Sequence, residues 1–317
     1  MRVLVTGGFG FVGGRLCKYL DEQESFDIVC SSRTHHIETN SPRLSTAIVD
    51  WACIESLKAS CAGVDVVVHL AAMNAGDSAN DPVGALMING VATVRLLEAA
   101  KAVGVRRFIY LSTAHVYGSP LVGILTEDTC PSPVHPYATS HRAAEDAVIA
   151  SNYQGTIEGI VLRLSNSFGA PARPDINCWG LLINDLCRQA VTTNLLELRS
   201  TGLQRRDFIP MTDVCRAIKH LMVLPKKMLQ QQIFNVGSGW SPTLLDVVNM
   251  IADRCEQRFG VRPSLTRQSP RNGETAANLD YRIDALSATG FVLSTEPITE
   301  LDNLLSFCHY NFGVDCG

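Results

Sequence analysis

A glycine-rich stretch close to the first residue limits the fold of this chain more than any other feature. The segment TGGFGFVGGR follows the apolar run RVLVT directly and opens an amphipathic segment, with glycines at G-x-x-G-x-x-G spacing. Glycines there permit a tight turn and a close approach of the backbone to a pyrophosphate at the positive end of the following helix. The loop therefore predicts a dinucleotide site that includes Gly7, Gly10, Phe11, Val12 and Gly13.

Short apolar runs alternate with longer segments of helical period through the first half of the chain. Strands are expected at 2–6, 26–32, 45–50, 64–70, 106–112 and 157–164, and helices at 11–23, 82–104 and 136–152. Most of these strands are apolar on both faces, which suits a parallel sheet covered by helices on each side. We predict an α/β fold with a Rossmann-type doubly wound parallel sheet.

The regular alternation loosens after about Asn166, where a loop rich in Pro and Gly begins. Helices are then expected at 179–191, 212–224 and 243–259 and strands at 195–200, 205–210 and 232–237, whereas the tail shows little regular period. The predicted division is a dinucleotide-binding domain of residues 1–165, to which residues 205–235 return, and a smaller C-terminal substrate-binding lobe of residues 166–204 and 236–317.

The end of the second strand indicates which dinucleotide is preferred. An acidic residue there would bond the 2′-hydroxyl of the adenosine ribose and repel a 2′-phosphate. The chain instead carries Ser31, Ser32 and Arg33, and a guanidinium group can bind a phosphate through two hydrogen bonds. The pattern favours NADP(H) over NAD(H), which stays possible. The alternative is that these are ordinary surface residues and that discrimination lies elsewhere.

Further dinucleotide contacts are expected where the third and fourth strands end. Asp50 and Trp51 offer a polar and an aromatic edge for adenine, although Trp51 could equally belong to the core. After the fourth strand, Leu70, Ala71 and Ala72 lie where the backbone of such a sheet approaches its cofactor.

Seven segments occur together in one order: TGGFGFVG, VDVVVHLAA, NGVATVRLLEAAKAVGVRRFIYLSTAHVYG, HPYATSH, VLRLSNSFG, RRDFIPMTDVCRAI and FNVGSG. In these segments and their spacing the chain resembles the extended short-chain dehydrogenase/reductase family, in particular its nucleotide-sugar epimerase, dehydratase and reductase branch. The likeness spans nearly the whole chain. It is highly specific for the fold and the cofactor class and much less specific for the reaction.

The resemblance implies catalytic roles for Thr113 and Tyr137, and it places His141 where the family carries a lysine. That lysine anchors the nicotinamide ribose and, through its charge, lowers the pKa of the tyrosine. A neutral histidine retains one N–H donor for the ribose but not the charge. Tyr137 is then a poor base and a serviceable acid, so the substitution favours ketone reduction.

The resemblance also implies substrate contacts. Asn166 matches a position that contacts the substrate, and Arg206 and Arg271 match positions that hold its diphosphate or nucleoside. Planar guanidinium groups suit a diphosphate; the alternative is that both are surface charges. Dehydratases of this branch carry acidic residues after the catalytic threonine, but here Ala114 and His115 follow it. A 4,6-dehydratase is therefore not expected, and His115 either touches the substrate or points into the core.

The leading hypothesis is an NADP(H)-dependent reductase of a keto-sugar attached to a nucleoside diphosphate. The alternatives are a nucleotide-sugar epimerase that retains its cofactor, a reductase of a steroid or flavonoid ketone, and a non-catalytic dinucleotide-binding protein. The missing lysine is the best evidence for the last of these. Against it, the threonine, the tyrosine, the asparagine and both arginines are all present.

Composition bears on partners and location. The net charge is −4, and the mixed charges along the chain form no basic stripe, so nucleic acid is not an expected partner. Apolar runs such as 64–72 are too short to cross a bilayer. Eleven cysteines without a C-x-x-C pair favour reduced thiols in the cytoplasm, and no histidine spacing suggests a metal site. The resemblance implies a homodimer formed by the helix at about 83–103 and the helix that bears Tyr137.

Overall fold

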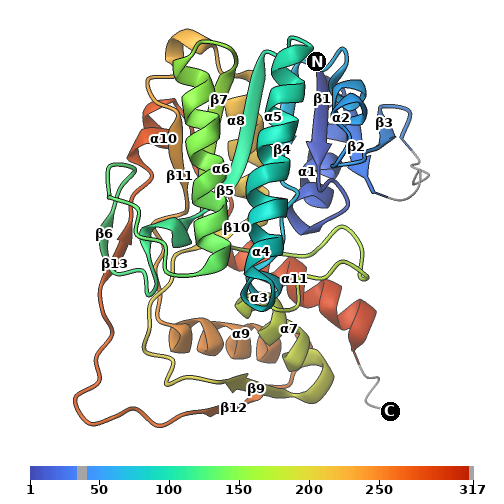
Figure 1. The fold of residues 1–317 in the computed structure, drawn as a ribbon. Helices are drawn as coiled ribbons and strands as arrows, with labels where there is room; N and C mark the ends of the chain where they lie inside the picture. The colour runs from blue at the N-terminus through green and yellow to red at the C-terminus, as the bar shows by residue number, and fades with distance from the viewer. Residues whose placement is uncertain (34–40, 314–317) are drawn as a thin grey trace.

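A seven-stranded parallel sheet forms the centre of the molecule (Figure 1). The computed structural model describes residues 1–33 and 41–313. The strand order is β11-β7-β5-β4-β1-β2-β3, which confirms the predicted Rossmann-type doubly wound α/β fold. The strands are β1 (Arg2–Thr6), β2 (Asp27–Ser32), β3 (Leu44–Ile48), β4 (Val66–His69), β5 (Arg107–Thr113), β7 (Glu158–Leu164) and β11 (Ile233–Val236).

Helices cover both faces of the sheet because successive residues of a strand point to opposite sides. Leu4 and Val67 belong to the core beneath one helical layer, and Val3 and Val66 belong to the core beneath the other. The first layer, at the front of Figure 1, contains α2 (Ile54–Cys61), α5 (Ala92–Ala102) and α6 (Pro136–Tyr153). The second contains α1 (Phe11–Asp21), α8 (Met211–Val223) and α10 (Asp284–Ala288).

The expected helix at 82–104 is continuous but changes its winding. It consists of α4 (Pro82–Ala85), a π-helical turn, η1 (Leu86–Val91), and α5. This segment is long and apolar enough, by length and composition alone, to cross a membrane, and half of it is buried. That differs from the sequence expectation, which considered only short apolar runs. Here the helix packs against α2 and α6 as part of the core layer.

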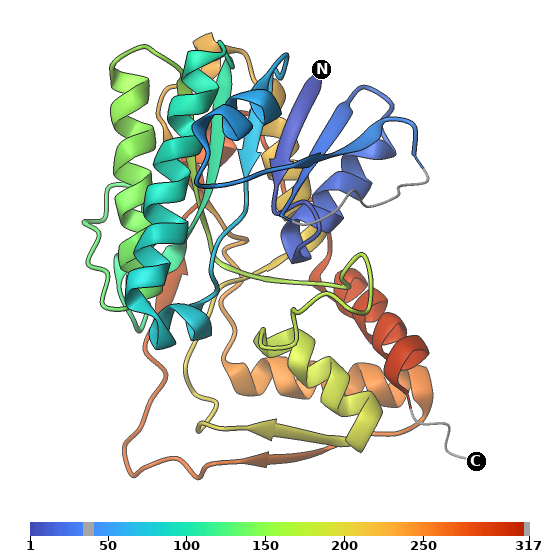
Figure 2. The same cartoon turned by 45° about the vertical axis from the view of Figure 1, so that its right-hand side comes forward.

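A second hydrophobic core builds the lobe, which lies below the sheet in Figure 2. It is formed by α7 (Leu182–Thr193), α9 (Leu244–Phe259), α11 (Pro297–Phe312) and β9 (Leu195–Leu198), and β9 pairs with β12 (Ser264–Arg267). The expectation of an irregular tail was wrong, because α11 spans sixteen residues. Its buried positions Leu301, Leu304, Leu305 and Cys308 have helical spacing.

Short elements join the lobe to the sheet. Two small parallel pairs are β8 (Asn166–Phe168) with β10 (Phe208–Pro210), and β6 (Gly123–Leu125) with β13 (Leu279–Tyr281). Further short helices are α3 (Ala75–Asn80), η2 (Ala114–Tyr117) and η3 (Lys226–Met228). Leu286 and Phe291 pack into the core of the sheet, so part of the C-terminal segment returns to the sheet rather than staying in the lobe.

An ion pair connects the first helix with the last. Arg15 of α1 donates to Glu300 of α11 at 2.9 Å, to the carbonyl oxygen of Ala170 at 2.7 Å and to the hydroxyl of Thr212 at 2.9 Å. Glu300 is buried and also accepts a hydrogen bond from the Thr212 hydroxyl at 2.6 Å. This cluster ties the glycine-loop helix to the lobe.

Candidate active site

The glycine loop joins β1 to α1 with the compact geometry that its sequence predicts. Gly7 has a φ of +68°, and the amide of Gly10 donates to its carbonyl oxygen at 2.9 Å. A Cβ at Gly13 would overlap that same oxygen, and a Cβ at Gly7 would lie 3.0 Å from the amide nitrogen of Ala71. These positions therefore require glycine for steric reasons.

The first turn of α1 is open to an anion. Gly10 caps the helix without a side-chain hydrogen bond, and no acidic residue lies in the first turn of this described helix. The free amides and the helix dipole both favour negative charge there. Phe11 and Val12, the first residues of the helix, pack against the core of the sheet. The cradle fits the pyrophosphate of a dinucleotide.

The other predicted dinucleotide contacts lie at the carboxyl ends of neighbouring strands. Ser31 is buried, Ser32 is half-buried and Arg33 is exposed at the end of β2. Residues 34–40, which follow, lie outside the described part of the chain. After β4, the amides of Leu70 and Ala71 donate to the hydroxyl of Thr6 at 3.1 and 3.3 Å; Ala72 is exposed.

After β3, Asp50 and Trp51 differ in character. Asp50 is exposed, and its carboxylate accepts a hydrogen bond from the amide of Ala52 at 2.9 Å. The Trp51 ring lies 5.8 Å from the ring of His69 and packs partly against the core. Trp51 thus belongs in part to the core, as the alternative interpretation held, while Asp50 remains open to solvent.

Thr113 and Tyr137 lie together, although they come from different elements. Thr113 ends β5, and Tyr137 stands in the first turn of α6, after the N-cap His135, whose ring nitrogen accepts from the amide of Tyr137 at 3.2 Å. Burial raises the pKa of Tyr137, and a hydrogen bond with Thr113 offsets part of that increase. The phenol is therefore protonated at neutral pH.

His141 stands one turn after Tyr137 and faces the sheet. Its Nδ1 lies 3.0 Å from the carbonyl oxygen of Tyr137, and the two rings are 4.3 Å apart. Burial lowers the pKa of His141 to about 4, so the ring is neutral at pH 7 and gives Tyr137 no neighbouring cation. Because the carbonyl can only accept, the one N–H of the neutral ring is already used. The expected donation to a ribose hydroxyl is not available in this tautomer.

The sequence interpretation missed Asn89, which lies in the π-helical turn. Its carbonyl oxygen accepts from Thr93 at 2.6 Å, its side-chain amide donates to Ser140 at 2.9 Å, and its side-chain oxygen accepts from the amide of Met73 at 2.7 Å. Ser140 in turn donates to the carbonyl of Tyr137 at 3.0 Å. Asn89 therefore links the helix to the start of α6, and π turns often occur at functional sites.

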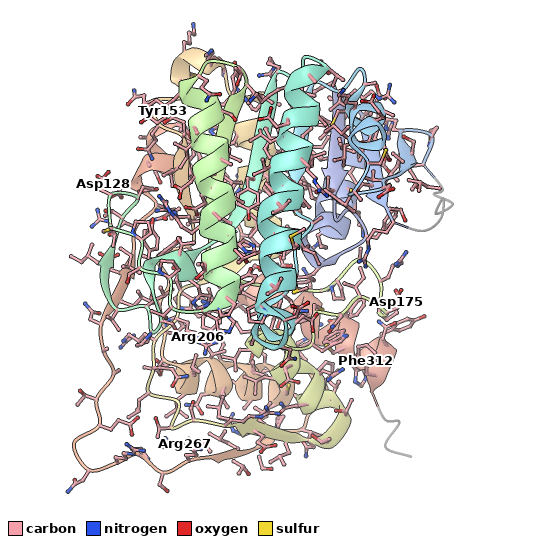
Figure 3. The ribbon with its side chains drawn as sticks, in the orientation of Figure 1. Asp128, Tyr153, Asp175, Arg206, Arg267 and Phe312 are labelled. Atoms are coloured by element: carbon pink, nitrogen blue, oxygen red, sulfur yellow. The ribbon has the colours of Figure 1, made fainter. Side chains whose placement is uncertain are left out.

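Arg206, His115 and Asn166, the residues predicted to contact the substrate, lie near one another in the fold. His115 is exposed, yet burial and the charge of Arg206 lower its pKa, which indicates that the two side chains are close. Asn166 donates to the carbonyl oxygen of Asp207 at 2.9 Å, next to Arg206. In Figure 3, Arg206 lies between the lower end of α6 and helix α9. Among the described residues no carboxylate pairs with it, so its charge is available to an anion.

Arg271 is exposed on the loop that follows β12. Its amide bonds to Glu274 at 2.9 Å, and Glu274 accepts from the hydroxyl of Thr201 at 2.6 Å. This loop is therefore tied to the segment that precedes Arg206, but within the described ranges the structure records no contact between the two guanidinium groups. No group of three or more His, Cys, Asp or Glu in those ranges could hold a metal ion.

Comparison with known families agrees with this geometry. The profile of the NAD dependent epimerase/dehydratase family matches residues 3–237. The chain belongs to this family. Because the family contains epimerases and dehydratases, membership establishes the nucleotide-sugar enzyme class without selecting the reaction.

Individual relatives lie at moderate distance. The chain is 28% identical over 268 residues to "Uncharacterized UDP-glucose epimerase YtcB" of Bacillus subtilis, which covers 80% of this chain and 82% of the relative. The solved structure "MoeE5 in complex with UDP-glucose and NAD" is 29% identical with a TM-score of 0.80, covering 98% of this chain and 99% of MoeE5. RMD from Pseudomonas aeruginosa complexed with NADPH is 25% identical with a TM-score of 0.78, covering 98% and 99% of the two chains.

Proposed function

We propose that this protein is an NADP(H)-dependent reductase of a keto-sugar attached to a nucleoside diphosphate. The observation that carries this proposal is the environment of Tyr137, a protonated phenol bonded to Thr113 with a neutral imidazole behind it. A phenol of raised pKa gives up its proton to a substrate oxygen that becomes strongly basic, whereas it is a poor base for an alcohol. The site therefore suits reduction better than oxidation.

Each residue has a defined task in this reaction. Thr113 bonds the ketone oxygen and orients it, and Tyr137 donates its proton to that oxygen. When bound, the reduced dinucleotide supplies the hydride. His115 and Asn166 border the sugar, and Arg206 and Arg271 bind the diphosphate or nucleoside. The presence of Ala114 in place of a proton-transferring side chain supports the proposal that the protein does not act as a 4,6-dehydratase.

The preference for NADP(H) rests on the end of β2. Ser31, Ser32 and Arg33 provide hydroxyls and a cation where a carboxylate would exclude a 2′-phosphate. RMD was solved with NADPH and MoeE5 with NAD, so relatives of this fold are known with each dinucleotide.

An epimerase that retains its cofactor is the second candidate, because YtcB is named as one. Such an enzyme must first oxidise its substrate and so needs Tyr137 as a base, for which the described residues provide no neighbouring lysine. A non-catalytic dinucleotide-binding protein is the third candidate.

The deciding experiment follows NADPH absorbance with nucleotide-linked 4-keto-6-deoxy sugars. We expect oxidation of NADPH, and Tyr137→Phe should lower kcat/KM by about 10²- to 10⁴-fold. Interconversion of UDP-glucose and UDP-galactose without added dinucleotide would instead establish the epimerase. Dinucleotide binding without turnover of either substrate class would establish the non-catalytic protein.

We further propose a homodimer in the cytoplasm. The helix from α4 to α5 exposes a row of apolar side chains, among them Val83 at 72% and Met87 at 49% exposure. Such a face beside α6 suits a second copy of the chain. Sedimentation measurements of the purified protein test the assembly.

A further inference from the structure

His141 does not lie on the open wall of the site. Only 2% of its surface is exposed, whereas Tyr137 one turn earlier is only half-buried. Its ring lies between the rings of Tyr137, at 4.3 Å, and Tyr110, at 5.9 Å. A side chain that binds a cofactor has to be reachable from the cleft. His141 instead forms the layer behind the catalytic tyrosine.

The hydrogen bonding of His141 leaves one acceptor to be satisfied. Its Nδ1–H donates to the carbonyl oxygen of Tyr137 at 3.0 Å. In the neutral ring, Nε2 then carries a lone pair. No hydrogen bond to Nε2 is formed by the described residues, so this nitrogen can accept one from a further partner.

Two hydroxyl groups beside the ring also need partners. Tyr110 and Ser112 are 1% and 3% exposed, and neither hydroxyl has a hydrogen-bond partner in the described part of the chain. They are two residues apart on β5 and so share a face. Tyr110 packs into the same core as Ala144 of α6, so both hydroxyls face α6. Unpaired buried hydroxyls are costly, and native proteins rarely keep them.

A carboxylate completes this set of groups. Glu145 stands one turn after His141 and pairs with Arg163 of β7 at 2.8 Å. Arg163 is the sheet neighbour of Ser112. The Oε1 atom of Glu145 accepts only one hydrogen bond in the described structure, from Arg163 at 3.1 Å. The layer between β5 and α6 therefore contains two free donors and two acceptors with remaining capacity.

We propose that these four groups bind one internal water molecule, and that His141 is a positioning residue for Tyr137 and not a ligand of the nicotinamide ribose. A water molecule accepts two hydrogen bonds and donates two. It accepts from the hydroxyls of Tyr110 and Ser112 and donates to His141 Nε2 and Glu145 Oε1. The ring is thereby fixed at both nitrogens and supports Tyr137 from behind. The inference uses the dinucleotide site and does not depend on which ketone is reduced.

The water site is tested first by thermal stability. Tyr110→Phe removes one hydroxyl and keeps the ring, so it should lower Tm if that hydroxyl is bonded to water. Tyr117→Phe is the matched control, because its buried hydroxyl donates directly to Asn235 at 2.7 Å, and its loss of Tm sets the scale. A Tyr110→Phe protein as stable as the parent, or more stable, would show a dry hydroxyl and overturn the water site. A crystal structure with a water peak between β5 and α6 would support it.

The role of His141 is tested by NADPH binding to His141→Phe. For a positioning residue we expect a dissociation constant within about threefold of the parent value, while kcat falls by about tenfold or more because Tyr137 is less well oriented. A rise of about tenfold or more in the dissociation constant would make His141 a ribose ligand and overturn the assignment. An unchanged kcat would overturn it as well.

Two controls keep this test decisive. Gly13→Ala should abolish NADPH binding and shows the range of the assay. If His141→Phe does not fold, Ser112→Ala serves in its place, with the same expectation of lowered kcat and preserved NADPH affinity. Should no keto-sugar be turned over, the proposed reaction fails, but the Tm and binding measurements still decide the water site and the ribose contact.

Discussion

The Nδ1 atom of His141 donates to the carbonyl oxygen of Tyr137 at 3.0 Å, within the same helix that bears the tyrosine. The histidine thus belongs to the support of the phenol and carries no charge at neutral pH. A lysine in the same place would reach past the helix and bring a cation to the site. The absence of that cation is the reason for proposing ketone reduction as the reaction.

Gly13→Ala should abolish dinucleotide binding, because its Cβ would overlap the carbonyl oxygen of Gly7. We expect no saturation at millimolar NADPH in a fluorescence titration. Gly180→Ala is the control, since a Cβ there meets nothing within 4 Å. Normal binding by Gly13→Ala would mean that this loop does not carry the pyrophosphate.

Arg33→Asp should shift the preference from NADPH toward NADH. The new carboxylate repels a 2′-phosphate and can accept from a 2′-hydroxyl, so the KM for NADPH should rise by about tenfold or more. Arg173→Asp, which alters another exposed arginine, should leave the KM values for NADPH and NADH unchanged. Equal KM values for NADPH in Arg33→Asp and the parent would assign discrimination to another part of the chain.

Arg206→Met should weaken binding of the nucleotide sugar. The guanidinium is half-buried and has no carboxylate partner among the described residues, so an anionic substrate is its natural counterion. Loss of a charge-assisted hydrogen bond should raise the KM of the sugar nucleotide by about ten- to a hundredfold and leave that of NADPH unchanged. Steady-state kinetics with each substrate varied separately decides this, and an unchanged sugar KM would remove Arg206 from the site.

Glu145→Gln should destabilise the fold strongly. Glu145 and Arg163 have side-chain exposures of 0% and 1%, and removal of one partner of such a pair costs about 3–5 kcal/mol. Asp146→Asn breaks an exposed pair with Arg142 on the same helix and should cost less than about 1 kcal/mol. Urea denaturation of both variants at pH 7 measures the difference; equal losses would contradict the structural assignment.

Acid should destabilise the protein through His141. Its pKa is about 4 when folded, against the ordinary value of 6.5 for histidine, so the unfolded chain binds a proton first and stability falls as the pH drops from about 6.5 toward 4. His69, with a pKa of about 3, acts in the same direction. Burial raises the pKa of Asp207 to about 6. The stability that this group contributes is lost as the pH rises, so its effect opposes that of the two histidines.

The contribution of His141 is isolated by comparing the free energy of unfolding of the parent protein with that of His141→Phe across pH. The parent should lose on the order of 3 kcal/mol relative to the variant between pH 7 and 4. Parallel stability curves for the two proteins would show that His141 is not buried in its neutral form.

Much of the sheet and the glycine loop could be predicted, because both depend on local patterns. Alternation of apolar strands with amphipathic helices specifies the layers, and the steric needs of Gly7 and Gly13 appear directly in their spacing. The resemblance likewise predicted that Thr113 and Tyr137 belong to one catalytic site. Helix α11 could also have been found, since Pro297 and the spacing of Leu301 and Leu305 are helical signals.

Other features depend on contacts that the sequence does not display. The direction of the His141 ring is set by the carbonyl one turn earlier and by the packing of Tyr110. The π-helical turn that places Asn89 follows from its bonds to Met73 and Ser140, far apart in the chain. Whether Arg271 approaches Arg206 depends on the path of a loop with little regular pattern.

The ion pair between Arg15 and Glu300 joins the first helix of the chain directly to the last. A displacement of α1 would disturb the hydrogen bonds of Arg15 to Glu300 and Thr212, and so would a displacement of α11. Any coupling that this contact carries between the two proposed ligands must be reciprocal, so each changes the affinity for the other by the same factor. The path of the chain, which starts at the sheet and returns to it through its final helix, thus places a direct contact between the glycine-loop helix and the lobe.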